Sequence, residues 1–274
     1  MDRKRYKFQK WFVSLIFLGA LLPLSADIKT QFIEPHKTTF NKLAMDLWDY
    51  AELGYQENQS VEAISKILNK EGFSIKYNVA NIPTAFIAEY GKSGPVIAIL
   101  GEFDALPGLA QTQSVFREVE NNNTGAGQAC GHHLFGAGSA WAAVAIKDWL
   151  DANNINGRIR FYGTPAEEGG SGKVYMVRAG LFKDVDVVLH WHPDDQNSAN
   201  IATNNSNKSA KFLFKGISTH AAGAPDMGRS ALDGVESMNM MVNMMREHIP
   251  QESRIHYVIT KGGLAPNVVP EEAE

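Results

Sequence analysis

The amino-acid sequence predicts an α/β protein with a mainly parallel sheet and helices on both faces. Three short apolar segments, 95–100, 158–162 and 185–189, have the length and composition of buried strands. Helices predicted over 134–153 and 172–179 separate these segments, and this alternation of strand and helix favours a parallel sheet. Each of the three strands leads into acids or histidines. Open α/β sheets place their sites at the carboxyl ends of strands, so the predicted fold also indicates where function lies.

Two helices and two strands are predicted before the first of these segments. Over residues 35–55, apolar side chains recur at intervals of three and four, which indicates a helix with one buried face. A second helix is predicted over 60–71, with Gly72 as its C-cap. Segments 73–77 and 83–89 have the composition of strands.

A smaller α/β unit is predicted for the last part of the chain. The polar run 204–208 has the composition of a domain boundary. A strand over 210–215, a helix over 231–248 and a strand over 254–260 follow it in the order β-α-β. The predicted domains are a larger one over 27–205 and a smaller one over 206–274.

The first 26 residues are predicted to be a secretory signal peptide. A basic segment, 1–10, precedes the apolar run 11–24, and the small residues Ser25 and Ala26 follow. The apolar run is short for a membrane span, which needs roughly twenty residues. Cleavage after Ala26 would give a secreted or periplasmic protein, and an uncleaved membrane anchor is the alternative.

Composition limits the classes of function. With 274 residues, 44% of them hydrophobic, the chain can bury one large core or two modest ones. A formal net charge of −4, with no basic run beyond the first ten residues, argues against nucleic-acid binding. A single cysteine excludes an intramolecular disulfide.

Potential metal ligands follow the predicted strands. Cys130 is the only cysteine, and a thiolate followed two positions later by the imidazole of His132 can bind a zinc-like ion. Two glutamates, Glu167 and Glu168, come after the second strand, and His192 comes after the third. The alternative for Cys130 is a buried structural role, because a lone cysteine usually packs as a small apolar residue.

The adjacent acids and histidines are expected to divide their roles. Neighbouring glutamates on a loop cannot face the same way, so one of Glu167 and Glu168 can bind a metal while the other transfers protons. A solvated loop is the alternative for this pair. His190 and His192 point to opposite faces of an extended chain, so only one is expected to reach the metal. His133 is expected to face away from the site.

Asp104 and the identity of the metal are less constrained. Asp104 follows the first strand, where it could orient a metal ligand through a hydrogen bond without binding the ion itself. The alternative is that Asp104 caps the end of the strand. Zinc suits a ligand set of cysteine, histidine and glutamate best, with manganese or cobalt as alternatives.

Together these motifs resemble the M20 family of metallopeptidases and amidohydrolases. The chain is most similar to the branch that contains one subunit of aminobenzoyl-glutamate hydrolase and the related N-acyl-amino-acid hydrolases. The resemblance covers nearly all of the chain after the predicted signal peptide. The motifs that carry it are Ala51–Tyr55, Glu102–Pro107, Ala129–His132, Pro165–Gly170, Trp191–Pro193, Ser218–Ala222 and Gly262–Pro270.

The resemblance implies two divalent metal ions and a role for each candidate residue. Cys130 would bridge the two ions, and Glu167 would be the general base. The further ligands would be His132, Glu168 and His192.

The resemblance also implies a lid. The second domain would be a ferredoxin-like α/β lid that forms a homodimer, or a hetero-oligomer with a related subunit. His220 and Asn267 match lid positions that hold the substrate or its tetrahedral intermediate, with His220 acting across the dimer interface. Without the resemblance, His220 would be taken for a surface residue. Family members continue past the lid and supply one more metal histidine, so both domains are expected to be incomplete at the C-terminus.

These inferences predict a metal-dependent amidohydrolase. The substrate would be a small N-acyl or aroyl amino acid such as p-aminobenzoyl-glutamate. The alternative is a truncated, catalytically inactive fragment or binding module, and we expect the 274-residue chain by itself to have little or no activity. A serine hydrolase is disfavoured, because the sequence has no Gly-x-Ser-x-Gly motif.

Overall fold

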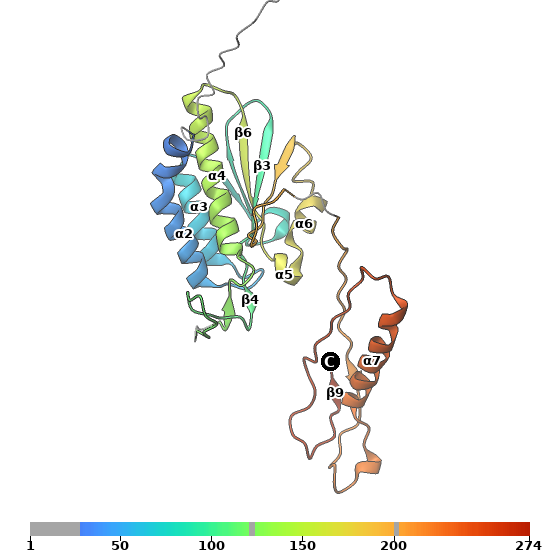
Figure 1. Cartoon of the computed structure of the whole chain (residues 1–274). Helices are drawn as coiled ribbons and strands as arrows, with labels where there is room; N and C mark the ends of the chain where they lie inside the picture. Colours follow the sequence, from blue (N-terminus) through green and yellow to red (C-terminus); the bar gives the residue numbers. More distant parts are fainter. Residues whose placement is uncertain (1–27, 121–123, 200–202) are drawn as a thin grey trace, which may run out of the picture. The chain divides into compact units, whose positions relative to one another are not determined.

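The computed structural model describes residues 28–120, 124–199 and 203–274 (Figure 1). The predicted signal peptide, 1–26, lies outside the described residues. The chain divides into two compact units between Gln196 and Asn197. The domain boundary between residues 205 and 206 stays a prediction of the sequence. Among the described helices, none combines the length and the apolar composition that a bilayer span requires.

The first unit is built on a five-stranded sheet in the order β1-β2-β6-β3-β7. Its strands are β1 (Ser74–Tyr77), β2 (Phe86–Tyr90), β3 (Val96–Gly101), β6 (Arg158–Gly163) and β7 (Val187–Leu189). β3 is parallel to β6 and to β7, whereas β2 is antiparallel to both of its neighbours, β1 and β6. The sheet is therefore mixed but mostly parallel, since β2 alone runs against the other strands. The predicted α/β class is confirmed.

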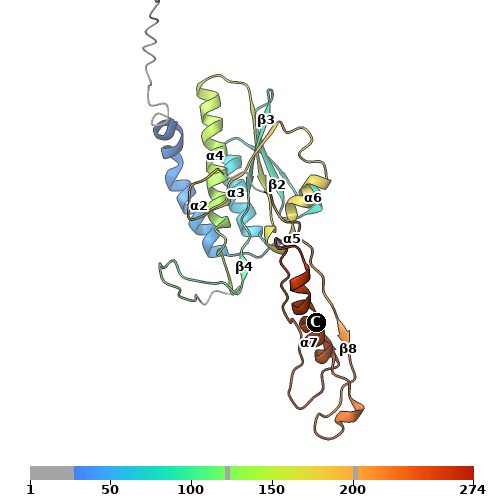
Figure 2. The same ribbon diagram turned by 45° about the vertical axis from the view of Figure 1, so that its right-hand side comes forward.

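Helices cover both faces of this sheet (Figures 1 and 2). Three of them, α2 (Lys37–Tyr50), α3 (Asn58–Lys70) and α4 (His132–Ala152), pack on one face, and α6 (Gly172–Arg178) packs on the other. Because side chains alternate along a strand, β6 contributes to both cores. Phe161 packs with the three-helix face and Tyr162 with the α6 face. Short π and 3-10 turns precede or connect these elements: η1 (Lys29–Ile33), η2 (Glu34–His36) and η3 (Val79–Asn81).

The carboxyl ends of β3 and β6 lie side by side. Gly101 pairs with Gly163, and the backbone N–H of Thr164 donates to the carbonyl of Gly101 at 2.9 Å. A Cβ at Gly101 would lie 2.7 Å from the ring of Phe161, and a Cβ at Gly163 would lie 2.2 Å from the ring of Phe86. Glycine is therefore required at both positions. The segments that follow the two strands leave the sheet at the same edge.

A small antiparallel pair, which the sequence did not indicate, lies next to this edge. β4 (Leu106–Pro107) pairs with β5 (Ala126–Gly127), and Leu106 lies opposite Gly127. Asp104 lies just before the first of these strands and Cys130 just after the second. The pairing therefore brings two stretches of chain that are distant in sequence to the same end of the sheet.

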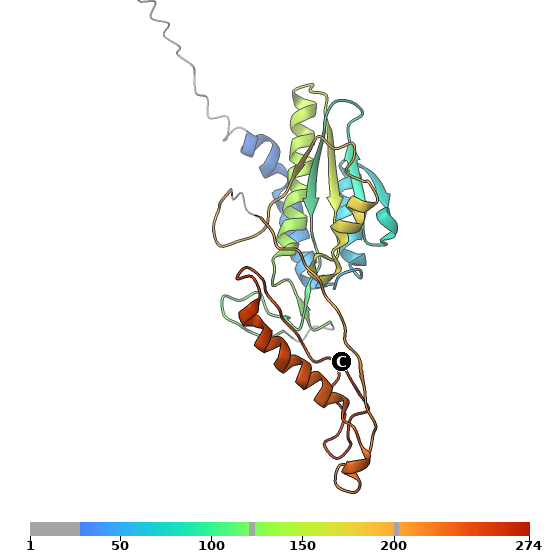
Figure 3. The same cartoon turned by 90° about the vertical axis from the view of Figure 1, so that its right-hand side faces the viewer.

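Over residues 203–274, the second unit has one α-helix and one short strand pair. β8 (Phe214–Lys215) pairs antiparallel with β9 (Glu272–Ala273). The helix α7 (Ala231–Met245), the orange-red helix of Figure 3, packs against them. Two 3-10 helices, η4 (Pro225–Met227) and η5 (Arg246–His248), flank α7. The predicted helix over 231–248 corresponds to α7 together with η5. One helix and one short strand pair do not establish a ferredoxin-like fold, so the lid stays a prediction.

One predicted strand of this unit is wrong and another is shorter than expected. Residues 254–260 form no strand, and only β8 remains of the strand predicted over 210–215. A strand requires a pairing partner along its length. The predicted strand has such a partner only at its end, where the backbone N–H groups of Thr260 and the adjoining Lys261 donate to the carbonyl of Glu274.

Candidate metal centre

Asp104 connects two parts of the candidate site through its two carboxylate oxygens. Its Oδ1 lies 2.9 Å from Nδ1 of His132, the first residue of α4, and its Oδ2 accepts the backbone N–H of Glu168 at 2.8 Å. An Asp–His contact of this kind fixes the ring and the tautomer of a histidine ligand. Nε2 of His132 is therefore the atom left to bind an ion.

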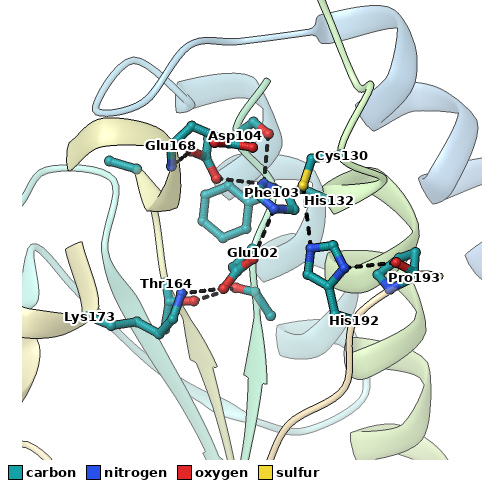
Figure 4. Close-up of polar contacts among 12 residues, drawn as sticks. Glu102, Phe103, Asp104, Cys130, His132, Thr164, Glu168, Lys173, His192 and Pro193 are labelled. Atoms are coloured by element: carbon teal, nitrogen blue, oxygen red, sulfur yellow. Dashed lines mark hydrogen bonds and ion pairs between the residues drawn. The ribbon is translucent and has the colours of Figure 1, made fainter. Parts of the chain in front are cut away.

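Cys130 and His192 lie on the other side of the His132 ring (Figure 4). The sulfur of Cys130 is 3.4 Å from Nε2 of His192, and the rings of His132 and His192 meet edge to face with centroids 5.5 Å apart. Nδ1 of His192 is 2.8 Å from the carbonyl of Pro193, which leaves Nε2 facing the sulfur. One ligand atom from each of Cys130, His132 and His192 lies within 4.8 Å of the others, a spacing that a metal ion could bridge.

Charges around this group favour the protonated thiol and imidazole. Burial, and after it the Glu168 carboxylate, raises the pKa of the Cys130 thiol to about 12. Burial opposes the charge on His132, but Asp104 and Glu102 outweigh it and raise the pKa of the imidazole. Cysteine and histidine bind metal ions without these protons, so ion binding here would be accompanied by proton release.

Glu102, the residue after β3, lies against the same imidazole. Its side chain is 3% exposed, its Oε2 lies 3.0 Å from Nε2 of His132, and its Oε1 forms an ion pair with Lys173. Burial opposes the ionisation of Glu102, but His132 and Lys173 outweigh it and lower the pKa of this carboxyl. Within the described residues, Oε2 of Glu102 and Nε2 of His132 have no hydrogen-bond partner. Because buried polar atoms without a hydrogen bond are costly, these two atoms are suited to bind a cation.

Glu167 and Glu168 begin the short helix α5 (Glu167–Gly170). Glu167 joins Glu102 and His132 in a second group whose ligand atoms all lie within 4.8 Å of one another. Partial burial, followed by the charges of Glu102 and Glu168, raises the pKa of Glu167. A raised pKa brings a carboxyl closer to neutral pH, which favours proton transfer.

The remaining histidines of the two motifs face elsewhere. His190 packs edge to face on Phe135 with ring centroids 5.0 Å apart, and its Nε2 lies 3.9 Å from Oε1 of Glu102. His133 packs on Trp48, and burial followed by the charge of His132 lowers its pKa to about 4. Neither belongs to the two donor groups found among the described residues.

A buried glutamate from the N-terminal part of the chain supports the loop that carries Glu167. Glu57 is fully buried, and its Oε1 accepts the backbone N–H of Ala166 at 2.8 Å. Ala166 adopts the left-handed conformation with φ of 53°, which is uncommon for a residue with a side chain. The hydroxyl of Tyr55 donates to the carbonyl of Gly170 at 2.6 Å, so the loop is held at both ends.

The buried position of Glu57 predicts a pH-dependent effect on stability. Burial raises its pKa from 4.5 to about 7 in the folded chain. The stability that this group contributes is therefore present below pH 4.5 and lost as the pH rises through about 7. The Glu57→Gln variant, which keeps an acceptor for Ala166, should lack this loss and gain up to about 3 kcal/mol over the wild type between pH 4.5 and 8.

Urea unfolding of both proteins at pH 5 and pH 8, with a chelator present, measures this difference. Titration of other groups cancels when the two proteins are compared. Equal pH dependence in the wild type and in Glu57→Gln would contradict the assignment.

The two predicted lid residues lie close together in the second unit. His220 forms an isolated bridge with Val268, and the N–H of Ala221 donates to the carbonyl of Asn267 at 3.0 Å. Nδ1 of His220 accepts the backbone N–H groups of Ala222 and Gly223, each at 3.1 Å. These bonds fix the ring and leave Nε2 as its outward donor.

Sequence reasoning missed Glu102, Lys173 and Glu57. Glu102 immediately follows β3, and the rule that singled out Asp104 applies to it equally. Lys173 lies on α6 and Glu57 just before α3, so each reaches its partner only through tertiary packing. No local pattern marks such a contact.

The chain is similar to known hydrolases. Residues 98–268, more than half of the chain, match the model of peptidase family M20/M25/M40. One subunit of the p-aminobenzoyl-glutamate hydrolase of Escherichia coli is 44% identical over 88% of the chain and 50% of its own length. The Xaa-Arg dipeptidase of Mus musculus is 29% identical over 85% of the chain and 52% of its own length. The chain spans about half the length of these curated relatives.

Solved structures share the fold. A dinuclear metal-binding peptidase of the M20 family from Bacillus subtilis superposes with a TM-score of 0.54 at 24% identity, covering 87% of the chain and 62% of the other. An aminobenzoyl-glutamate utilization protein from Klebsiella pneumoniae gives a TM-score of 0.54 at 19% identity, covering 89% of the chain and 67% of the other. From the sequence match and the shared fold, the chain belongs to peptidase family M20/M25/M40.

Proposed function

We propose that the protein formed by this chain is a metal-dependent amidohydrolase. It would cleave the amide bond between an acyl or aroyl group and an amino acid, with p-aminobenzoyl-glutamate as the favoured substrate. The observation that carries the proposal is the convergence of Cys130, His132 and His192 beside the Glu167–Glu168 pair. The 44% identity to one subunit of the p-aminobenzoyl-glutamate hydrolase of Escherichia coli supports the substrate.

Each residue of the candidate site has a proposed task. Four residues would hold two divalent ions. Cys130 would be shared by the ions, and the further ligands would be His132, Glu168 and His192. Such ions supply Lewis acidity and lower the pKa of water from 15.7 to about 7. Zinc suits these donors best, and manganese or cobalt would also fit.

Proton transfer is assigned to Glu167. It would take a proton from the attacking water and deliver it to the nitrogen of the leaving amino acid. Its membership of the donor group with His132 supports this task, because a base must lie close to the water that it activates. Asp104 would keep Nε2 of His132 free of a proton by accepting from Nδ1–H.

The second unit would contribute to substrate binding and assembly. His220 and Asn267 would contact the substrate, and an imidazole donor there could stabilise a developing oxyanion. Assembly would be a homodimer, or a hetero-oligomer with a related chain, since two Escherichia coli relatives are named as different subunits of one hydrolase. Export by a cleaved signal peptide remains part of the proposal.

Hydrolysis of p-aminobenzoyl-glutamate tests the proposal. The purified chain, loaded with zinc, manganese or cobalt, is placed in excess over substrate so that a single slow turnover is recorded. We expect p-aminobenzoate to appear, to stop appearing when a chelator is added, and to appear again when the metal is restored. Substrates with other acyl groups and amino acids then define specificity.

Metal binding without product would contradict hydrolysis by this chain and favour the alternative of an inactive fragment or binding module. Product formation that persists in chelator would contradict a metal-dependent mechanism. Elemental analysis of the same samples separates these outcomes, because it counts the ions bound per chain.

A further inference from the structure

We propose that Glu102 is a further carboxylate ligand of the metal centre, held in place by Lys173. This inference rests on the proposed metal centre and adds one residue to it. Glu102 follows β3 directly, at the edge where the site forms. It is 2% exposed, so its charge requires a partner inside the protein.

The two oxygens of Glu102 have different surroundings. Oε1 forms the ion pair with Lys173 and lies 3.9 Å from Nε2 of His190. Oε2 is turned toward His132 and has no hydrogen bond within the described residues. One oxygen therefore anchors the side chain, and the other faces only the His132 imidazole, where it would bind a cation in exchange for the imidazole proton.

The imidazole of His132, which faces this oxygen, also has one nitrogen without a hydrogen bond within the described residues. Nδ1 of His132 is occupied by Asp104, and Nε2 is buried without a hydrogen-bond partner among the described residues. Nε2 and Oε2 of Glu102 form an ion pair at 3.0 Å, although the contact lacks the geometry of a hydrogen bond. Two buried ligand atoms at this separation, with no hydrogen bond to another described group, have the spacing of neighbouring ligands around one ion.

The two donor groups complete the argument. The ligand atoms of Glu102, His132 and Glu167 lie within 4.8 Å of one another, and those of Cys130, His132 and His192 form the other such group. His132 belongs to both groups, so Glu102 adds a carboxylate oxygen next to the imidazole that the two groups share. A hard oxygen ligand at that position would favour ions such as manganese relative to a site built from sulfur and nitrogen alone.

Metal titration of Glu102 variants tests this inference. Competition with a chromophoric chelator gives the affinity for Zn²⁺ and Mn²⁺, and the visible spectrum of the Co²⁺ form reports the ligand set directly. We expect Glu102→Gln to weaken binding of at least one ion by ~10-fold or more and to alter the Co²⁺ spectrum. Glu102→Asp, which keeps a carboxylate on a shorter side chain, should be intermediate, and it serves if the glutamine variant does not fold.

Two controls separate ligation from structural support. Glu52→Gln changes a buried carboxylate of the same type, which accepts the backbone N–H groups of Gln59 and Ser60 and lies outside both donor groups of the described residues, so it should leave the metal affinity unchanged. Lys173→Met removes the ion-pair partner and leaves the carboxylate, so it should lower affinity less than Glu102→Gln does. Equal losses in Lys173→Met and Glu102→Gln would overturn ligation by Glu102 in favour of an ion-pair role.

The outcomes also distinguish this inference from the proposed function. Wild-type affinity and an unchanged Co²⁺ spectrum in Glu102→Gln would overturn the role of Glu102 while leaving the metal centre intact. A wild-type chain that binds no ion would overturn the metal centre itself, and the inference with it.

Discussion

Replacing Cys130 with alanine is expected to weaken metal binding by more than ~100-fold, because loss of even an outer partner of a ligand costs ~10–100-fold. The sulfur lies 3.4 Å from Nε2 of His192 and belongs to the donor group with His132. In the proposed arrangement it serves both ions, so its loss should lower the affinity for each. Chelator competition and elemental analysis of the purified variant measure the effect.

A neighbouring histidine supplies the control for this experiment. His133 lies in the same motif but packs on Trp48, outside both donor groups of the described residues. The His133→Gln variant should therefore keep the affinity of the wild type. Full metal occupancy in Cys130→Ala would show that the thiol is not a ligand, and the proposed centre would then lack Cys130.

Replacing Glu167 with glutamine is expected to slow hydrolysis by about 10²–10⁴-fold, the usual contribution of a general acid–base residue. Glutamine keeps the size of the side chain and removes its capacity to accept a proton. Metal content should change little, because the proposed ligands remain. Single-turnover release of p-aminobenzoate gives the rate, and elemental analysis of the same sample gives the occupancy.

Glu168→Gln is the matched comparison, since the two acids are adjacent in sequence. If Glu168 is the ligand and Glu167 the base, Glu168→Gln should lose metal while Glu167→Gln keeps it. The reverse pattern would exchange the two roles. The structure makes this comparison worthwhile, because it groups Glu167 rather than Glu168 with His132 and Glu102.

Sequence patterns predicted most of the first unit because its elements are long and periodic. The helices around Phe40 and Ile64 and the strand around Ile99 have regular apolar spacing, and the structure contains all three. The reversed direction of β2 was not predicted. The short connection from β1 permits only an antiparallel neighbour, so the spacing of the two strands is the signal that could have given it.

The candidate site was predicted less completely than the fold. Ligand types that are rare in a chain, such as Cys130 and the paired histidines, are conspicuous in sequence. Glu102 and Glu57 are common residues whose importance arises from burial and from partners far along the chain. The position of Glu102 directly after a strand was a usable signal, but the partners of both residues are products of tertiary packing, which no local pattern encodes.

The paired glycines at the ends of β3 and β6 limit how this site can diversify. Phe161 and Phe86 occupy the space that a larger side chain at Gly101 or Gly163 would need. A side chain at either glycine would displace a buried aromatic ring, so we expect changes in substrate preference to come from the flanking loops. Libraries built to alter specificity should leave both glycines untouched.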